Sequence, residues 1–261
     1  MQYKDFVGDA RDLVINTLGE VERTQNVRVL YAVESGSRAW GFASPDSDYD
    51  VRFIYVRHVD DYLTLRPRRK DTIEWIVDET LDVCGWDLSK TLQLAHKGNL
   101  FLFEWANSPV VYKRTDDWNA VWEVVRPYFS PKAAMHSYLG IASTTKKEFL
   151  GGDLVRYKKY LYALRPLLAC KHIAEQGTIP PVDFGELVAS AADDELIPAI
   201  DELLQAKVRM NEKDEGPRIA AIDEFIANAL ATYAGVANEL AGTDHPWEPL
   251  EHAFLHTLGI A

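Results

Sequence analysis

Two groups of residues between Glu34 and Val56 have the types and spacing needed for phosphate and metal chemistry. The first is Gly36-Ser37, which follows a β-branched and aromatic run typical of a buried strand. Glycine lets the backbone approach a ligand closely, and the N–H groups at the start of a helix favour an anion such as a phosphate. We interpret Gly36-Ser37 as a candidate phosphate-binding turn between a strand and a short helix.

The second group is Asp48 and Asp50, at the start of the next predicted strand. Residues i and i+2 of a strand point to the same face, so these two carboxylates should converge. Carboxylates shared with substrate phosphates suit Mg²⁺ or Mn²⁺. Either group alone is usually an ordinary turn or a solvated surface, but the combination, with strands on both sides, predicts a site. Ser47 is expected to cap or orient the loop before Asp48.

Predicted strands and helices alternate in the first part of the chain, and they must position these two groups. Apolar periodicity, turn residues and capping residues set their limits. We expect strands at 27–33, 48–56, 72–77 and 81–86, an extended segment at 108–112, and helices at 3–21, 38–42, 59–65, 88–97, 99–106 and 116–125.

The pattern becomes helical after Ser130-Pro131, a good N-cap and N1 pair. We therefore place the domain boundary near 113–130. Glycine and proline interrupt the later helices, and the stretch 211–217 (NEKDEGP) is predicted to be a flexible loop. The expected helices span about 131–150, 153–175, 183–191, 195–209 and 218–240.

Charge and composition limit the class of protein. The 261 residues carry a net charge of −12, which argues against a general nucleic-acid binder because nonspecific affinity comes from many Lys and Arg contacts. Basic residues gather at 66–70 and 146–165, where a solvated face is the usual explanation. The two cysteines, Cys84 and Cys170, give no disulfide framework or zinc spacing. His136 and His172 are assigned no role.

The chain contains no apolar run long enough for a membrane span, and its first residues are acidic where a signal peptide would be basic and then apolar. We therefore expect a cytoplasmic protein with no membrane partner. The sequence does not predict its oligomeric state.

The order strand, Gly-Ser, short helix and Asp-hydrophobic-Asp-hydrophobic resembles the signature of the DNA polymerase β-like nucleotidyltransferases. Further segments are similar to one branch of that superfamily, the RNA-ligase-associated predicted nucleotidyltransferases. The resemblance covers roughly residues 25–185. The further segments are 85–90 (GWDLSK), Asn99 with Glu104-Trp105, 108–112 (SPVVY) and 158–166 (KKYLYALRP).

The resemblance implies an α+β fold. A polymerase β-like catalytic domain at 1–115, with a small mixed sheet and helices, would be followed by an α-helical substrate-binding or accessory domain at 116–261. The implied activity is metal-dependent transfer of a nucleoside monophosphate from an NTP to an acceptor hydroxyl, with release of pyrophosphate. The acceptor is left open among an RNA end, a protein and a small molecule. The alternative is a regulatory, antitoxin-like or nucleotide-sensing module that binds NTP and Mg²⁺ with little turnover.

The resemblance also implies roles for the motif residues. Gly36 and Ser37 would hold the β- and γ-phosphates, and Asp48 and Asp50 would bind Mg²⁺ or Mn²⁺. The superfamily needs a third carboxylate on a neighbouring strand, which would bind the catalytic metal and help to deprotonate the acceptor. Asp82 and Asp87 are the two candidates, and in an unbroken strand they would face opposite sides. We favour Asp82, because Asp87 also suits the N-cap of the following helix.

Three basic residues are further candidates for nucleotide binding. Arg38 follows Ser37 directly and could reach a phosphate through its planar fork, although an ordinary ion pair is an equal alternative. Lys158 and Arg165 are seven residues apart and therefore share one face of a predicted helix. From that face they could line the cleft opposite the carboxylates. A solvated helix side is the alternative for these two and for the adjacent Lys159.

Overall fold

The computed structural model describes residues 7–44, 47–65, 70–76, 80–209 and 214–260. The chain divides into two compact units. Unit 1 contains 1–41, 47–129 and 244–261, and unit 2 contains 42–46 and 130–243. None of the helices within the described ranges is both long and apolar enough to span a membrane.

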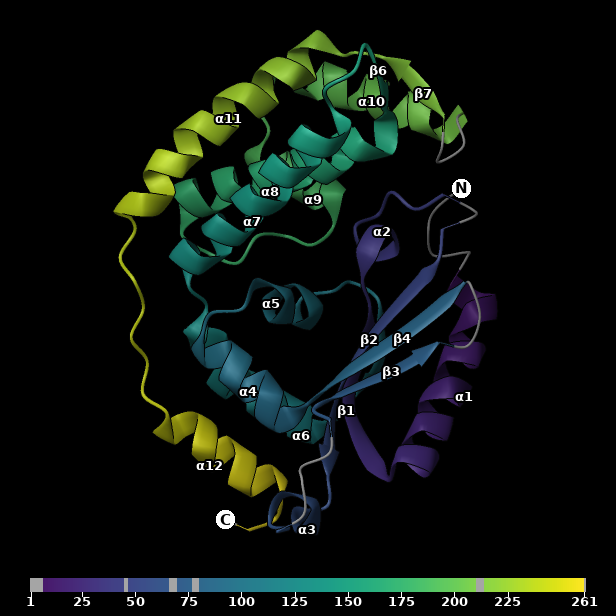
Figure 1. The fold of residues 1–261 in the computed structure, drawn as a ribbon, viewed down its shortest axis with the longest axis vertical. Helices are drawn as coiled ribbons and strands as arrows, with labels where there is room; N and C mark the ends of the chain where they lie inside the picture. The colour runs from purple at the N-terminus through teal and green to yellow at the C-terminus, as the bar shows by residue number, and fades with distance from the viewer. Residues whose placement is uncertain (1–6, 45–46, 66–69, 77–79, 210–213, 261) are drawn as a thin grey trace. The chain divides into compact units, whose positions relative to one another are not determined.

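Unit 1 is built on a five-stranded mixed sheet with the order β3-β4-β2-β1-β5 (Figure 1). The central strands β2 and β4 are parallel, and the other neighbours are antiparallel. The strands are β1 (Val27–Glu34), β2 (Tyr49–Arg57), β3 (Thr72–Ile76), β4 (Leu81–Asp87) and β5 (Val111–Arg114). This arrangement confirms the predicted α+β fold with a small mixed sheet. Of the expected strand 72–77, residue 77 lies outside the described residues, as do residues 66–69 of the basic segment.

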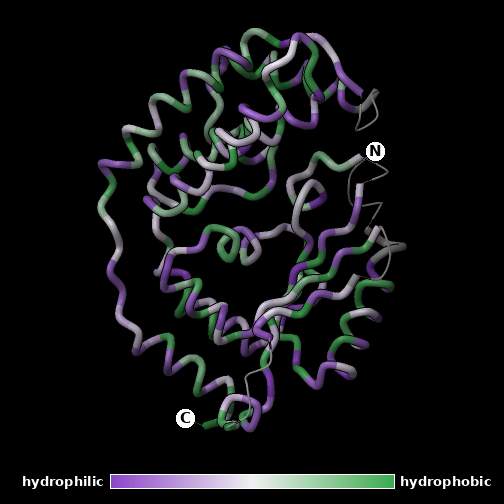
Figure 2. The backbone as a smooth tube through the Cα atoms, in the orientation of Figure 1, coloured by the Kyte–Doolittle hydropathy of each residue, from purple (hydrophilic) through white to green (hydrophobic). Residues whose placement is uncertain are grey.

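The helix α1 (Val7–Gln25) covers one face of the sheet (Figure 1). Its hydrophobic residues alternate with hydrophilic ones along the helix (Figure 2), and Val14, Leu18 and Val21 are buried against the sheet. The helix was predicted to end at residue 21, which is too early, because the spacing of apolar residues does not reveal a last turn made of polar residues. The helix instead ends before Asn26, whose φ is 52°.

The opposite face of the sheet is covered by α4 (Leu88–His96), α5 (Leu100–Ala106) and α6 (Asp116–Val125) (Figure 1). Trp118 of α6 is fully buried and stacks on Tyr31 of β1, with 4.7 Å between the ring centroids. Trp122 is buried beside Trp118, so the two tryptophans are core residues.

Three short elements of unit 1 lie between these strands and helices: α2 (Gly36–Ala39), α3 (Val59–Tyr62) and the 3₁₀ turn η2 (Arg126–Tyr128). The first two end earlier than the predicted helices at 38–42 and 59–65. The C-terminal helix α12 (Glu248–Thr257) was not predicted at all. Its signal in the sequence is modest, with Pro249 in the first turn and the apolar pair Leu250 and Phe254 four residues apart.

The units differ from the division at 1–115 and 116–261 predicted from the sequence. The helix α6 belongs to unit 1, because its tryptophans pack on the sheet, and α12 packs on α6 and α4. Both helices lie beyond residue 115, so helical content alone does not mark the boundary. The functional roles of the two predicted domains stay a prediction.

Unit 2 is mostly helical, and its long helices α7, α8 and α11 pack against one another. Ser130 caps α7 as predicted, since its side chain accepts a hydrogen bond from the Ala133 amide. The helices are α7 (Pro131–Phe149), α8 (Tyr157–Gln176), α9 (Phe184–Ala191), α10 (Ile197–Arg209) and α11 (Ala220–Glu239).

A two-stranded sheet in unit 2 replaces two predicted features. The strand β6 (Leu154–Arg156) occupies the predicted beginning of the helix at 153–175, and it pairs with β7 (Glu215–Pro217). The strand β7 lies in the stretch predicted as a flexible loop, of which residues 211–213 are outside the described residues. Both strands are three residues long, so sequence periodicity does not reveal them.

The segment that follows α2 is held by the helices of unit 2. Phe42 is buried, and its ring packs edge-on against Phe184 of α9 at 5.6 Å and beside Tyr162 of α8 at 6.5 Å. Lys207 of α10 donates a hydrogen bond to the Phe42 carbonyl. Phe42 is therefore anchored within unit 2 by side chains that are distant in the sequence.

Candidate active site

Gly36 and Asp50, fourteen residues apart in the sequence, meet at the end of β1. The Ser35 amide donates to the Asp50 carbonyl at 2.8 Å. Gly36 has a φ of 62°, and a Cβ atom at this position would lie 2.3 Å from Oδ2 of Asp50. Glycine is therefore required both by the backbone conformation and by the carboxylate against it. The two predicted chemical groups of the motif share one corner of the sheet.

Asp50 and Asp82 occupy paired positions on the parallel strands β2 and β4. Adjacent strands lie about 4.8 Å apart, so the two carboxylates are close neighbours on one face. The side chain of Arg52 lies between them: its Nη2 donates to Oδ1 of Asp50 at 3.1 Å and to Oδ2 of Asp82 at 2.8 Å. Nη1 of Arg52 also donates to the Asp82 carbonyl at 3.3 Å. Sequence reasoning missed Arg52, although its i+2 spacing from Asp50 places it on the same face.

Asp48 lies one residue before β2 and is exposed. Within the described part of the chain, no three Asp, Glu, His or Cys side chains converge to hold a metal ion. Mg²⁺ does not need three, because it is commonly held by one or two carboxylates, with substrate phosphates and water completing the shell. The paired oxygen atoms of Asp50 and Asp82, with the cationic group of Arg52 already between them, fit a divalent cation of this kind.

Asp87 has a different environment. It is buried on the other face of β4, and its Oδ1 accepts a hydrogen bond from the Ser89 amide at 2.8 Å, which caps α4. Tyr62 donates to the same carboxylate, and Nε of the buried Arg57 is 4.0 Å away. Burial raises the pKa of Asp87 despite these contacts. Asp87 is five positions further along the chain than Asp82, which places their Cα atoms about 16 Å apart in an extended strand.

Glu34, the last residue of β1, contacts Asp50 through its side chain. Its side chain is buried, with Oε1 accepting from the Asp50 amide at 2.8 Å and Oε2 accepting from the Tyr112 hydroxyl at 2.5 Å. Burial is the main reason that the pKa of Glu34 rises to about 7, and these two hydrogen bonds act in the opposite direction. Sequence reasoning did not assign it a role, although a carboxylate ending an apolar strand is an unusual feature.

Arg38 is buried and contacts the backbone beside Asp48. Its Nε donates to the Asp48 carbonyl at 3.0 Å, and its Nη2 donates to the Ser47 carbonyl at 2.5 Å. The guanidinium also lies 3.8 Å from the centroid of the Tyr49 ring. Arg38 thus holds the segment that leads into β2. Ser37, also predicted to contact phosphate, is mostly buried.

Lys158 and Arg165 both lie on α8 in unit 2, but their environments differ. Arg165 is buried and donates from Nε and Nη2 to the Val182 carbonyl, each at 3.4 Å. Lys158 is half-buried, with its ammonium 5.9 Å from the centroid of the Tyr162 ring. Their predicted contact with a nucleotide stays a prediction.

The Gly-Trp-Asp segment of β4 has a packing role at each residue. A Cβ atom on Gly85 would lie 2.2 Å from the Phe53 ring. Trp86 packs against Trp105 of α5, with 3.8 Å between centroids, and Asp87 caps α4. This segment packs β4 against its neighbours in the register that pairs Asp82 with Asp50.

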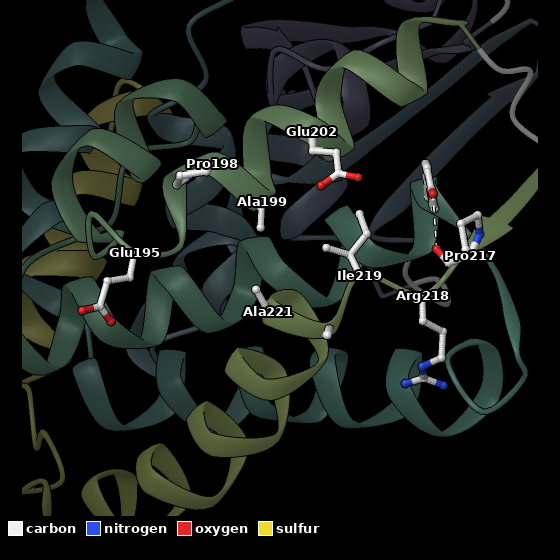
Figure 3. Close-up of a pocket in the computed structure, with 10 residues that line it drawn as sticks. Glu195, Pro198, Ala199, Glu202, Pro217, Arg218, Ile219 and Ala221 are labelled. Carbon is white, nitrogen blue, oxygen red and sulfur yellow. Dashed lines mark hydrogen bonds between the residues drawn. The ribbon is translucent and has the colours of Figure 1, made fainter.

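Two cavities in the described residues lie apart from the carboxylate pair. The cavity in unit 1, of about 510 Å³, is lined by Arg57, Tyr62 and Asp87 among others. The cavity in unit 2, of about 440 Å³, lies between α10 and the start of α11 (Figure 3). It presents Glu195 and Glu202, and its one arginine, Arg218, is held by Asp223. Neither lining contains Asp50 or Asp82.

The mixed sheet, the glycine turn and the paired carboxylates define a protein of the DNA polymerase β class. A family model described as "RNA repair pathway DNA polymerase beta family" matches residues 10–256, and the chain belongs to this family. It is 42% identical over 229 residues to the uncharacterized protein YcgL of Bacillus subtilis (strain 168), covering 87% of this chain and 88% of that protein.

A solved structure of a nucleotidyltransferase-like protein from Exiguobacterium sibiricum 255-15 also matches. It is 13% identical, with 96% of this chain and 80% of that chain covered, and the TM-score is 0.29. The family assignment depends on the family model and the Bacillus relative.

Proposed function

We propose that the protein transfers a nucleoside monophosphate from an NTP to an acceptor hydroxyl, using Asp50 and Asp82 as its central carboxylates. The observation that carries the proposal is the meeting of Gly36, Asp50 and Asp82 at one corner of the sheet. Family membership supports the same class of reaction. Because Asp87 is committed to capping α4, we assign the third carboxylate to Asp82.

Each residue has a distinct role in the proposed reaction. Gly36 and Ser37 hold the β- and γ-phosphates of the NTP, and Asp48, Asp50 and Asp82 would hold Mg²⁺ or Mn²⁺. Asp82 accepts the proton of the acceptor hydroxyl. The acceptor oxygen bonds to the α-phosphorus, the bond from that phosphorus to the bridging oxygen breaks, and pyrophosphate leaves. When bound, the divalent cation would neutralise the charge that develops on these oxygen atoms.

We further propose that an RNA end supplies the acceptor hydroxyl. The family description, which names an RNA repair pathway, supports this choice. The net charge of −12 does not favour a long nucleic acid, because few cations are left to neutralise phosphates. A terminal hydroxyl needs only a short contact, so an end is a better candidate than a duplex.

The test uses two labels on each NTP. The purified protein is incubated with Mg²⁺ and α-³²P or γ-³²P NTP, alone and with total RNA. We expect α-label on RNA and γ-label in pyrophosphate, with loss of both in Asp82→Asn by at least ~100-fold. Asp117→Asn, an exposed aspartate paired with Arg28, is the matched control and should remain active.

The other outcomes separate the remaining possibilities. Label on the protein or on an added small molecule would change the acceptor but keep the reaction. Binding of NTP with no transfer to any acceptor would indicate a nucleotide sensor and would refute the proposed transferase. Transfer of α-label that survives Asp50→Asn would place the chemistry elsewhere in the chain.

A further inference from the structure

Arg52 is a cation already bound to the two carboxylates proposed as the centre of the site. One nitrogen atom, Nη2, donates to both Oδ1 of Asp50 and Oδ2 of Asp82, and Nη1 holds the Asp82 carbonyl. The Arg52 side chain is only 19% exposed, whereas that of Asp82 is 48% exposed. The donor of this bridge is therefore a mostly buried side chain that packs on the sheet. The carboxylates that accept its hydrogen bonds are more exposed to solvent.

Such a bridge has a clear electrostatic purpose. Two carboxylates at paired strand positions repel each other. The guanidinium offsets this repulsion and fixes the side-chain directions of Asp50 and Asp82. The two carboxylates can therefore stay close together before any other cation arrives.

A divalent cation shared by Asp50 and Asp82 would need the oxygen lone pairs that Nη2 uses. The two cations could not both lie between the carboxylates, because positive charges within a few ångströms repel strongly at a partly buried site. We propose that Arg52 is an exchangeable counter-cation: its guanidinium holds Asp50 and Asp82 together without metal and leaves them when a divalent cation binds. This inference rests on the proposed function, since it assumes that the pair binds metal.

The exchange predicts that Arg52 competes with metal. Removing the guanidinium should raise the affinity for metal, because the incoming ion no longer displaces two charge-assisted hydrogen bonds. The same change should destabilise the metal-free protein, since the carboxylates then repel each other without compensation. If Arg52 only supports the fold, its removal should instead lower the affinity for metal, because a distorted site binds metal less well.

The experiment compares Mn²⁺ binding by wild type, Arg52→Gln and Arg28→Gln, using electron paramagnetic resonance of free Mn²⁺. Arg28→Gln removes the same charge from an exposed pair with Asp117 in the same unit, so it controls for net charge. We expect Arg52→Gln to bind Mn²⁺ roughly tenfold more tightly than wild type, and Arg28→Gln to match wild type. In thermal unfolding, Mn²⁺ should raise the melting temperature of Arg52→Gln more than that of wild type.

Asp50→Asn identifies which hypothesis fails. In one outcome, Asp50→Asn abolishes Mn²⁺ binding but Arg52→Gln binds Mn²⁺ no more tightly than wild type. This outcome refutes the exchange and leaves the proposed metal site in place. If no Mn²⁺ binding depends on Asp50 in either background, the proposed metal site and the exchange are both refuted. Arg52→Lys keeps the charge and should give an intermediate affinity.

Discussion

Asp50 and Asp82 lie opposite each other on the parallel strands β2 and β4, and one nitrogen atom of Arg52 is bonded to both carboxylates. This relationship depends on a parallel pairing between strands that are separated by β3 in the sequence. It places the carboxylates together without a turn or a loop between them. The register of β4, set by Gly85 and Trp86, is therefore part of the site.

The carboxylate pair and Asp87 should respond differently to substitution. Asp50→Asn and Asp82→Asn should keep the fold, because both side chains are partly exposed to solvent. Both variants should lose Mg²⁺-dependent NTP binding or transfer, because each loses a carboxylate of the proposed metal site. Asp87→Ala should instead lower the free energy of unfolding by about 2–4 kcal/mol, since it removes a helix cap and leaves Arg57 buried without its carboxylate. Urea denaturation and NTP titration separate the two effects. A stable but inactive Asp87→Ala protein would exchange the roles of Asp82 and Asp87.

Gly36→Ala should disturb Asp50 directly. The new Cβ atom would lie 2.3 Å from Oδ2 of Asp50, in addition to the cost of a positive φ. Gly177→Ala is a matched control, because Gly177 has a φ of 68° and nothing within 4 Å of a new Cβ atom. We expect both variants to lose about 1 kcal/mol of stability from backbone strain, but only Gly36→Ala to weaken NTP binding. Equal NTP affinities for the two variants would separate Gly36 from the site.

Tyr112 should matter to the site through Glu34. Tyr112→Phe leaves Oε2 of the buried Glu34 without its 2.5 Å donor, which should cost about 1–3 kcal/mol of stability. Because Glu34 also holds the Asp50 amide, NTP binding should weaken as well. Tyr128→Phe removes a 2.6 Å hydrogen bond to the Pro246 carbonyl in the same unit and should leave NTP binding unchanged. The account of Glu34 fails if both variants bind NTP as wild type does.

His172 should make the protein less stable in acid. Its ring is buried and bonded to Ser190 through Nδ1 at 3.1 Å and to Thr178 through Nε2 at 3.0 Å. Burial lowers the pKa of His172 below its usual 6.5, so the folded protein holds a neutral ring. As the pH falls below about 6.5, the unfolded chain binds a proton that the folded chain rejects, and the free energy of unfolding decreases.

The measurement for this prediction is urea denaturation of wild type and His172→Gln at pH 7.5 and 5.5. We expect the wild type to lose more stability than the variant between these two values. Equal losses would show that another group controls the acid sensitivity.

The sequence predicted much of the fold, because β1 and β2 are long and rich in apolar residues and because α6 carries two tryptophans at helical spacing. The predicted bounds 116–125 agree with the helix Asp116–Val125, whose first turn is capped by the Thr115 side chain. The strands β6 and β7 and the helix α12 were missed. Each depends on pairing or packing with residues far away in the chain, which local periodicity does not report.

The sequence also predicted most of the residues at the candidate site, since Gly36, Asp50 and Asp82 follow from motif and strand positions. It did not predict Arg52 and Glu34, because their roles depend on the register between strands. Arg38 was predicted to reach a phosphate, and its contacts with the carbonyls of Ser47 and Asp48 depend on how the loop returns to β2. Side-chain partners of this kind are set by the fold and not by spacing in one segment.

The most direct measurement is the anomalous diffraction of a crystal grown with Mn²⁺ and a non-hydrolysable NTP analogue. We expect a manganese peak between the carboxylates of Asp50 and Asp82, the phosphates against Gly36-Ser37, and Arg52 turned away from the pair. A manganese peak at Asp87, or an NTP analogue bound with no metal at Asp50 and Asp82, would contradict the account.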